Sequence, residues 1–358
     1  MAHDTQRFTR RTLMATAGAL GAAAAPSLAQ GTDRIVWRLA TVTPLGFPLV
    51  GDAVQDFART VVAMSNGRLG FEIDDPSKNG GPAGLMKLVR EGRYDAAHAT
   101  AHYYAGEIPA IDYFTAVPFG LTAVENHGWM NEGGGAALFE AILEPLGVVP
   151  MICGNTNVQM GGWYAHEIRS VNDLRNLRIR MAGLPARVLG RFGAKSLEVG
   201  FGQIIAAFQN GTINAADIIG PWVDQPLGVG EYAPFYYGPW HEPDVSMHLF
   251  VNKQRFEALP PDLQQIVRQA SAAVSMRSIA KAQYRNAVAL AELERAGTVV
   301  RTFPPAVTKA LQRVTAELLE EDARRDEMSA RVIASFKAYL AVVKRYARAT
   351  DAVAVLQR

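Results

Sequence analysis

The stretch Leu177–Gly183 (LRIRMAG) has the alternation of a short β-strand that ends in a charged residue. Successive side chains of a strand point to opposite faces, so its apolar residues share one face and Arg178 and Arg180 share the other. The apolar face can then pack while both arginines reach outward. Because Arg180 lies at the strand end, just before a Gly turn, we expect it to hold an anion, and we expect Arg178 to be ordinary surface.

The segments around this strand have the pattern of α/β units. Residues 35–40 alternate like a strand, and a polar loop and a helical stretch at 49–64 follow them. Two later stretches, 85–90 and 204–209, both read as helices that end at a Gly and lead into a strand. Gly ends a helix readily because it adopts the left-handed conformation at little cost. The pattern predicts an α/β fold with two lobes built on one plan and a ligand cleft between them.

The last third of the chain reads as helical. The stretch Leu263–Ala296 lacks Gly and Pro and predicts a helix about 50 Å long, which we expect to run across both lobes. A second helical region follows from about 306 to 346, and its charged run at 320–327 is interpreted as a solvated face. The apolar stripe of this region needs a partner in the same chain or in a second copy; it comprises Ile333, Phe336, Tyr339, Leu340 and Val343.

Residues 1–30 read as an export signal. Arg10 and Arg11 precede an apolar run from Leu13 to Ala25, which is too short to span a bilayer, and small residues follow it. The paired arginines suggest the twin-arginine (Tat) route. We therefore expect a periplasmic protein in which lobe I comprises 31–157 with about 246–260, and lobe II comprises 158–245. The long helix then takes 261–297 and the C-terminal helices 305–348.

Composition excludes several classes of protein. The 358 residues carry 36 Lys and Arg against 34 Asp and Glu, so no nucleic-acid partner is implied. Cys153 is the only cysteine, which rules out an intrachain disulfide and predicts a small buried side chain. The sequence contains no Gly-x-Ser-x-Gly elbow and no His-Glu-x-x-His motif.

Three oxygen-bearing side chains fall in separate polar segments. Gln159 lies in a loop rich in amides and glycines, although that loop can also be read as a turn that serves backbone geometry. Asp217 ends a strand at 213–218, where an α/β sheet exposes its crevice. Glu242 lies in the aromatic, Pro-flanked stretch 236–243. Oxygen donors of these kinds suit Na⁺ or Ca²⁺, so the spacing admits a cation site without requiring one.

Four segments come in the order found in one family, and the chain resembles the solute-binding proteins of TRAP (tripartite ATP-independent periplasmic) transporters of the DctP type. These segments are Gly161–Tyr164, Leu177–Gly183, Ile213–Pro221 and Tyr237–Glu242. The chain is most similar to the branch that binds 2-oxo or 2-hydroxy monocarboxylates with a metal ion. The resemblance implies a two-lobed periplasmic binding protein, not an enzyme, which delivers a pyruvate- or lactate-like ligand to membrane permease subunits. It also suggests a homodimer formed through the C-terminal helices.

The resemblance also implies roles for individual residues. Arg180 would pair with the substrate carboxylate, and Gln159 would contact both substrate and cation. Asp217, Glu242 and the main-chain carbonyl of Ile218 would complete the metal site for Na⁺ or Ca²⁺. The branch often has Glu-Trp where this chain has Asp217-Ile218, so the sequence leaves the cation and the carboxylate open.

Further residues are expected at the cleft. Asn155 and Tyr103 are predicted to bind the substrate, and Tyr104 and Phe119 are further candidates for the lining. Two other functions stay open at this point: a periplasmic enzyme that acts on a 2-oxo acid, and a ligand-sensing subunit of a signalling system.

Overall fold

Two β-sheets organise residues 34–82 and 84–358, the part of the chain that the computed structural model describes. The first sheet has the order β2-β1-β3-β10-β4, with β1 (Ile35–Thr41), β2 (Leu69–Asp74), β3 (Ala96–Ala99), β4 (Val148–Asn155) and β10 (Ser246–Asn252). The first three of these strands are parallel, and β10 is antiparallel to both of its neighbours. The predicted export signal at 1–30 lies outside the described residues.

The second sheet has the order β11-β9-β5-β8-β6-β7. Its strands are short: β5 (Gly162–Tyr164), β6 (Arg178–Arg180), β7 (Lys195–Leu197), β8 (Ala215–Ala216), β9 (Phe235–Tyr237) and β11 (Val299–Arg301). The strand predicted around Arg180 is β6. Its alternation is confirmed, because the apolar residues of the stretch are buried while Arg178 is exposed.

Helices connect and cover these strands. Those before β6 are α1 (Val50–Met64), α2 (Pro76–Asn79), α3 (Leu85–Arg90), η1 (Ala101–Tyr104), η2 (Pro109–Phe114), α4 (Ala123–Asn131), α5 (Gly135–Leu143), η3 (Glu144–Leu146) and η4 (Val171–Asn176). Those between β6 and β10 are α6 (Gly183–Gly190), η5 (Phe201–Gln203), α7 (Ile204–Gln209), α8 (Pro221–Asp224), η6 (Gln225–Leu227) and η7 (Val229–Glu231). The predicted helices at 85–90 and 204–209 are confirmed as α3 and α7. Gly92 and Gly211 follow them with φ of 70° and 73°.

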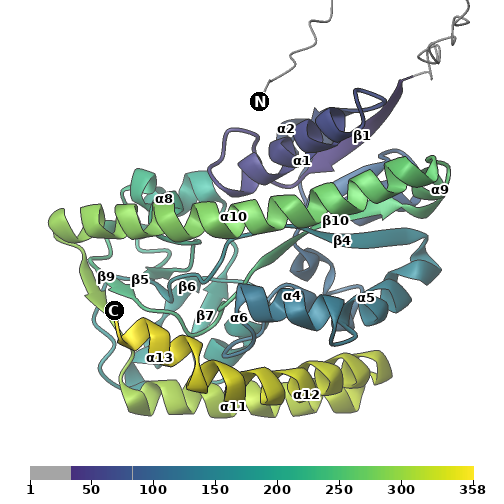
Figure 1. Cartoon of the computed structure of the whole chain (residues 1–358). Coiled ribbons are helices and arrows are strands. Elements are labelled where there is room, and N and C mark those ends of the chain that lie inside the picture. Colours follow the sequence, from purple (N-terminus) through teal and green to yellow (C-terminus); the bar gives the residue numbers. More distant parts are fainter. Residues whose placement is uncertain (1–33, 83) are drawn as a thin grey trace, which may run out of the picture. The chain divides into compact units, whose positions relative to one another are not determined.

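After α9 (Lys253–Glu257), the predicted long helix is α10 (Pro261–Arg295), which runs past both groups of elements (Figure 1). On the side of the first sheet, the Gly154 N–H at the end of β4 donates to Ser275 Oγ at 2.9 Å. On the side of the second sheet, the Trp222 N–H in α8 donates to Asn286 Oδ1 at 3.0 Å. The lobe-spanning role predicted for this helix is confirmed. Among the described helices, α10 included, none combines the length and apolarity that crossing a membrane requires.

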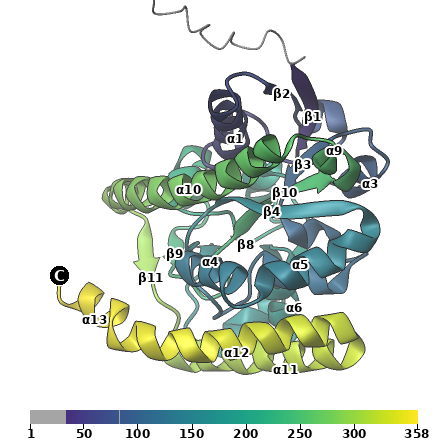
Figure 2. The same ribbon diagram turned by 45° about the vertical axis from the view of Figure 1, so that its right-hand side comes forward.

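The C-terminal helical region is split in two, α11 (Pro305–Arg325) and α12 (Glu327–Ala349), and α13 (Asp351–Leu356) follows. Figure 2 shows α11 and α12 lying side by side. The break comes at Asp326, which has an extended backbone. Its side chain accepts a hydrogen bond from the Ser329 N–H and so caps the start of a new helix. The apolar stripe finds a partner in the same chain, because Phe336 is buried against Trp129 with ring centroids 5.3 Å apart.

The interpretation of the charged run 320–327 as a solvated face is wrong for one member. Asp322 is buried, and it accepts two hydrogen bonds from Arg187 at 2.8 and 2.6 Å and one from the Tyr113 hydroxyl at 2.7 Å. These partners come from α6 and η2, so a charge inside an otherwise exposed run ties α11 to both lobes. Sequence spacing did not reveal this role, because the partners are more than 130 residues away in the chain.

The sheets locate the lobes. The first sheet draws its strands from 35–155 and 246–252, and the second from 162–237 and 299–301. The chain returns to the second sheet after α10, so β11 belongs to that sheet. This strand lies outside the range 158–245 that was predicted for lobe II. The boundaries predicted for the lobes stay predictions.

Two buried histidines in the first sheet predict how stability depends on pH. His98 on β3 and His248 on β10 lie on paired strands. Burial lowers the pKa of His98 to about 4, and burial with the neighbouring His98 lowers the pKa of His248 to about 3. Below pH 6.5 the unfolded chain binds protons at these positions and the folded chain does not, so these two histidines contribute a loss in the free energy of unfolding from pH 7 to pH 4.5.

His248→Phe removes one of these two groups and should reduce that loss by roughly 2 kcal/mol. The ring of His248 already lies 5.1 Å from Phe139 and 5.7 Å from Phe250, so an aromatic side chain suits the site. Urea unfolding of the parent and the variant at the two pH values measures the effect. Equal losses in both proteins would contradict the prediction.

Candidate functional site

Four of the predicted site residues lie at one edge of the second sheet; they are Gln159, Arg180, Asp217 and Glu242. β6 and β8 are parallel, with Arg180 opposite Ala216, so Arg180 and Asp217 both lie at the carboxyl ends of their strands. β5 is antiparallel to both β8 and β9. The residues just before β5, including Gln159, and those just after β9, including Glu242, therefore reach the same edge. The sheet topology brings together segments that are far apart in the sequence.

Arg180 is held from several directions. The Asp217 N–H donates to the Arg180 carbonyl at 2.9 Å, and Arg180 Nη1 donates in return to the Asp217 carbonyl. Arg180 Nε donates to the Val199 carbonyl at 2.9 Å, and the guanidinium lies 4.7 Å from the centre of the Phe201 ring. Among the described residues no carboxylate forms an ion pair with it. A guanidinium has five N–H donors, so this half-buried cation can still bind an anion.

A cluster of acidic groups lies beside this cation. The ligand atoms of Asp217, His241 and Glu242 all lie within 4.8 Å of one another. His241 is fully buried, and its Nε2 lies 3.0 Å from Asp217 Oδ1 and 4.0 Å from Glu242 Oε2. Burial and the nearby charge of Asp217 raise the pKa of Glu242 to about 8. Burial would lower the pKa of His241, but the charge of Asp217 and their hydrogen bond raise it.

Gln159 adds a neutral oxygen to the cluster. Its main-chain N–H donates to the Glu242 carbonyl at 3.0 Å, and its Nε2 donates to Thr156 Oγ1 at 2.9 Å. Its Oε1 is buried and has no hydrogen-bond partner among the described residues. A buried acceptor without a partner is costly unless a donor or a cation satisfies it. The donor set therefore fits a hard cation bound by carboxylate and amide oxygens.

Two residues that follow a strand of the first sheet lie within electrostatic range of this cluster. His102 and Tyr103 lie in η1, which follows β3, and their rings are 4.4 Å apart. Burial lowers the pKa of His102 to about 4, and Asp217 opposes this shift. Partial burial raises the pKa of Tyr103, while the charges of Arg180 and Glu242 act on it in opposite directions. Tyr103 is therefore within electrostatic range of the predicted carboxylate anchor.

Other predicted residues have different surroundings. Asn155 is fully buried, and its side-chain Nδ2 donates to Asp244 Oδ1 and to Ser246 Oγ. Tyr104 packs in the core of the first sheet, with its ring 5.5 Å from Phe250. Their roles at a ligand stay predictions without a contact in support.

Two predicted residues border the cluster through the main chain. The Phe119 N–H donates to the carbonyl of Trp240, and their rings are 6.0 Å apart, so Phe119 packs against the segment that carries Glu242. Ile218 has its side chain in the core of the second sheet. Only its main-chain carbonyl is therefore available to bind the metal, as was predicted.

His241 is the residue of this cluster that sequence reasoning missed. It precedes Glu242 in the stretch Trp240–Pro243, and the other histidines are scattered through the chain. A histidine next to a predicted metal ligand is the signal that could have pointed to it. Its contact with Asp217, 24 residues away, depends on the pairing of the strands.

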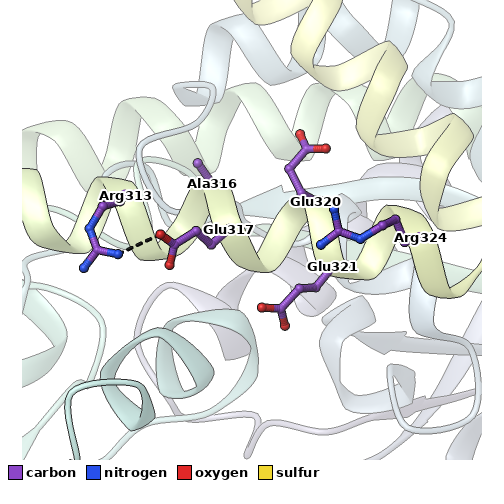
Figure 3. Close-up of a pocket in the computed structure, with 6 residues that line it drawn as sticks. All are labelled: Arg313, Ala316, Glu317, Glu320, Glu321 and Arg324. Atoms are coloured by element: carbon purple, nitrogen blue, oxygen red, sulfur yellow. Dashed lines mark hydrogen bonds and ion pairs between the residues drawn. The ribbon is translucent and has the colours of Figure 1, made fainter.

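A surface pocket elsewhere on the molecule has a different character. It lies along α11 and is lined by Arg313, Ala316, Glu317, Glu320, Glu321 and Arg324 (Figure 3). Arg313 Nη1 donates to Glu317 Oε1 at 2.7 Å, and Glu321 pairs with Arg191 at 2.6 Å. Exposed pairs of this kind are common on helices, and none of the predicted site residues lines the pocket.

The fold is that of a two-lobed α/β protein, and the groups at this site suit a small anion beside a cation. Residues 39–326 match the family of bacterial extracellular solute-binding proteins, family 7 (DctP). The chain belongs to this family. The family resemblance and the fold class predicted from the sequence are confirmed.

Individual relatives agree with this assignment. The monocarboxylate 2-oxoacid-binding periplasmic protein of Nostoc sp. (strain PCC 7120) is 33% identical over 318 residues, which cover 87% of this chain and 86% of that protein. A TRAP periplasmic solute-binding protein from Colwellia psychrerythraea, solved with bound calcium and pyruvate, is 34% identical. Its TM-score is 0.88, and the match covers 91% of this chain and 100% of that one.

Two further solved structures are similar. A TRAP periplasmic solute-binding protein from Pseudoalteromonas atlantica, with bound sodium and pyruvate, is 33% identical with a TM-score of 0.87, covering 91% of this chain and 100% of that one. A TRAP transporter solute-binding protein from Bordetella bronchiseptica, a mixed-occupancy dimer with calcium and picolinate, is 29% identical. Its TM-score is 0.87, with coverage of 90% and 97%.

The acidic cluster predicts a cost to stability that can be measured without any ligand. The folded pKa of Glu242 is about 8, above its value of about 4.5 in an unfolded chain. Between these values the unfolded chain ionises this carboxyl and the folded chain keeps it protonated, which lowers the free energy of unfolding. Glu242→Gln should raise the free energy of unfolding at pH 7.5 by about 1 kcal/mol or more, in buffer free of sodium and with a chelator.

The gain should shrink below pH 4.5, where the carboxyl of the parent protein is protonated in both states. Glu231→Gln, a change at an exposed carboxylate, serves as the control and should have little effect. Chemical denaturation with two-state analysis measures both variants. A Glu242→Gln protein that is less stable than the parent at pH 7.5 would refute the assignment of strain to this cluster.

Proposed function

We propose that the protein is the periplasmic solute-binding subunit of a TRAP-type transporter. It captures a small 2-oxo or 2-hydroxy monocarboxylate, similar to pyruvate or lactate, together with Na⁺ or Ca²⁺ and delivers it to the membrane permease subunits. The observation that carries this proposal is the meeting of Arg180 with the oxygen cluster of Gln159, Asp217 and Glu242 at one sheet edge. The relatives with bound pyruvate and calcium or sodium support it.

Arg180 binds the substrate carboxylate. Its guanidinium is anchored to the main chain at Val199 and Asp217, so little side-chain entropy is lost when an anion binds. A charge-assisted pair with a carboxylate in a partly dry site is among the stronger polar interactions in proteins. The position of Arg180 next to Asp217 places the substrate close to the cation.

The cation would be held by Asp217, Glu242, Gln159 Oε1 and the carbonyl of Ile218. When bound there, it would offset the negative charge of the two carboxylates and attract a carbonyl or hydroxyl oxygen next to the substrate carboxylate. His241 donates a hydrogen bond to Asp217 and orients that carboxylate. A 2-oxo or 2-hydroxy acid has both oxygen groups on adjacent carbons, which explains the preference for this class.

The two segments in which the chain passes between the lobes suggest how the lobes close on a ligand. The segments before β5 and after β9 run side by side, because the Thr156 N–H donates to the Val245 carbonyl at 3.1 Å and the Gln159 N–H to the Glu242 carbonyl. If lobe II comprises 158–245, Gln159 and Glu242 lie close to its boundaries. A ligand that contacts these residues then favours one arrangement of the lobes over another.

We assign the protein to transport and not to catalysis, because binding alone accounts for the groups at the site and the family is one of solute-binding proteins. A sensing role would use the same site with a different partner. Incubation of pyruvate with the protein and Ca²⁺, followed by NMR of the solution, tests the first point. Conversion of pyruvate to a product would contradict it.

Export and assembly are parts of the same proposal. Residues 1–30 direct the protein to the periplasm, by the Tat route. One relative is a dimer, and several exposed apolar residues of α12 and α13 support a homodimer of this chain through the C-terminal helices. They are Val342, Tyr346, Val353, Val355 and Leu356. A monomer mass in light scattering at micromolar concentration would contradict the dimer.

Arg180→Ala should weaken pyruvate binding in the presence of Ca²⁺ about 100-fold, since about 3 kcal/mol of charge-assisted hydrogen bonding is lost. Arg178→Ala is the matched control, because Arg178 lies on the same strand and is exposed. It should leave the affinity within about twofold. Calorimetric titration of both variants, with circular dichroism to confirm the fold, measures the difference. Near-normal affinity of Arg180→Ala would disprove its role as carboxylate anchor.

Removal of the cation should have a similar effect. Protein stripped of divalent ions and sodium should bind pyruvate at least tenfold more weakly, and Asp217→Ala should not recover affinity when Ca²⁺ is restored. A thermal-shift screen of small 2-oxo and 2-hydroxy acids, with and without Na⁺ or Ca²⁺, measures this and identifies the carboxylate. If affinity persisted in the stripped protein and in the variant, the cation would have no part in binding.

A further inference from the structure

Asp224 is a buried carboxylate whose hydrogen bonds are unusually complete. It is 1% exposed, at the end of α8. Oδ1 accepts the main-chain N–H groups of Ile219 at 3.1 Å and Gly220 at 2.9 Å. Oδ2 accepts Trp163 Nε1 at 2.9 Å and the Tyr236 hydroxyl at 2.8 Å. Four donors from three parts of the chain thus converge on one side chain.

The two main-chain donors belong to the turn that carries the proposed cation ligands. Ile219 and Gly220 directly follow Asp217 and Ile218. The N–H of Asp224 also donates to the Gly220 carbonyl at 2.9 Å, so the segment 217–224 closes on itself around the Asp224 carboxylate. The same segment is also bonded to α10, because the Trp222 N–H donates to Asn286 Oδ1. The direction of the Ile218 carbonyl depends on this turn.

The two aromatic donors connect Asp224 to the other ligand segments. Trp163 lies on β5, four residues after Gln159, and Tyr236 lies on β9, six residues before Glu242. Their rings stack with centroids 3.9 Å apart. One carboxylate therefore contacts elements next to each of the three side chains that are proposed to hold the cation, although it touches none of them itself.

We propose that Asp224 is a positioning residue for the cation site, which sets the turn 217–220 at a fixed distance from β5 and β9. This inference rests on the proposed function, because it concerns the same cation. Cation affinity depends on how closely the oxygen ligands match one geometry, and partners in the surrounding shell commonly control that match. A loss of these hydrogen bonds lets the turn move relative to the other two ligands.

A carboxylate that only stabilised the fold would have different consequences. Its removal would lower the melting temperature of the free protein and leave the ligand-induced rise in melting temperature unchanged. A positioning residue affects that rise as well, because it acts on the affinity for the cation. The dissociation constant for Ca²⁺ and the rise produced by Ca²⁺ with pyruvate separate the two roles.

Asp224→Asn keeps the shape of the side chain but replaces one carboxylate oxygen with an NH₂ group. This group cannot accept a hydrogen bond from Trp163 or from the two main-chain N–H groups. We expect Ca²⁺ affinity, measured by calorimetry with saturating pyruvate, to fall at least tenfold. Asp322→Asn is the matched control, since Asp322 is 6% exposed and hydrogen-bonded to Arg187 and Tyr113 in another part of the fold. It should destabilise the free protein and leave Ca²⁺ affinity within about threefold.

A second pair of variants covers the case that Asp224→Asn does not fold. Tyr236→Phe removes one donor to Asp224, whereas Tyr237→Phe removes a neighbouring hydroxyl that bonds only to the main chain of Ile168 among the described residues. Both tyrosines are buried. Tyr236→Phe should weaken Ca²⁺ binding about threefold or more, and Tyr237→Phe should not.

The outcomes separate this proposal from the function on which it rests. If the parent protein binds pyruvate with Ca²⁺ and the Asp224 and Tyr236 variants bind Ca²⁺ as well as their controls do, the positioning role is overturned and the function stands. If the parent protein shows no cation-dependent binding of any small carboxylate, the proposed cation site is refuted, and the proposed role of Asp224 is refuted as well.

Discussion

The parallel pairing of β6 with β8 is the constraint on which the site depends. It sets Arg180 opposite Ala216, so that the main-chain N–H of Asp217 donates to the Arg180 carbonyl and the Arg180 guanidinium donates to the Asp217 carbonyl. A shift of one residue would turn the Arg180 side chain to the opposite face of the sheet. Ile179 of β6 and the flanking residues Leu177 and Met181 are buried, and they oppose such a shift because it would expose their apolar surface to water. Packing of the core thereby specifies where the cationic group lies.

The acidic cluster shows a conflict between stability and binding. Asp217 and Glu242 are close together and largely removed from water, and the pKa of Glu242 rises as a result. Such a pair opposes folding at neutral pH unless a positive charge joins it. Functional sites often retain strain of this kind, since the groups that would relieve it belong to the ligand. Gln159 Oε1, which is buried without a hydrogen-bond partner in the described part of the chain, is a second instance.

Rigid supports surround this strained cluster. Asp224 is hydrogen-bonded to the turn after Asp217 and to the aromatic stack of Trp163 and Tyr236. The helix α10 holds the same turn through Asn286, and it holds the end of β4 through Ser275. A helix that contacts both lobes limits how they move relative to each other, while the short crossing segments leave room for rotation. The supports explain how a site built from three distant segments can keep one geometry.

The sequence alone determined much of the framework, because local patterns carry that information. The alternation around Arg180, the helices ended by Gly92 and Gly211 and the long stretch without Gly or Pro each reflect the conformational preferences of neighbouring residues. Gln159, Arg180, Asp217 and Glu242 were predicted as site residues from strand ends and from the family resemblance, and their roles stay predictions. The break at Asp326 was missed, since a polar residue inside a helical pattern does not by itself show that it begins a new helix.

Only the tertiary structure decided which polar side chains are buried together. His241, Asp224 and Asp322 look like ordinary polar residues in the sequence, and Asn155 looks like a ligand. Their roles depend on hydrogen bonds to partners that are distant in the chain or on other strands, and such partners follow from sheet order and register. A sequence pattern indicates which face of a strand or helix is apolar, but it does not indicate which faces pack against each other. The chemistry of the site was therefore readable from residue types, and its geometry was set by the fold.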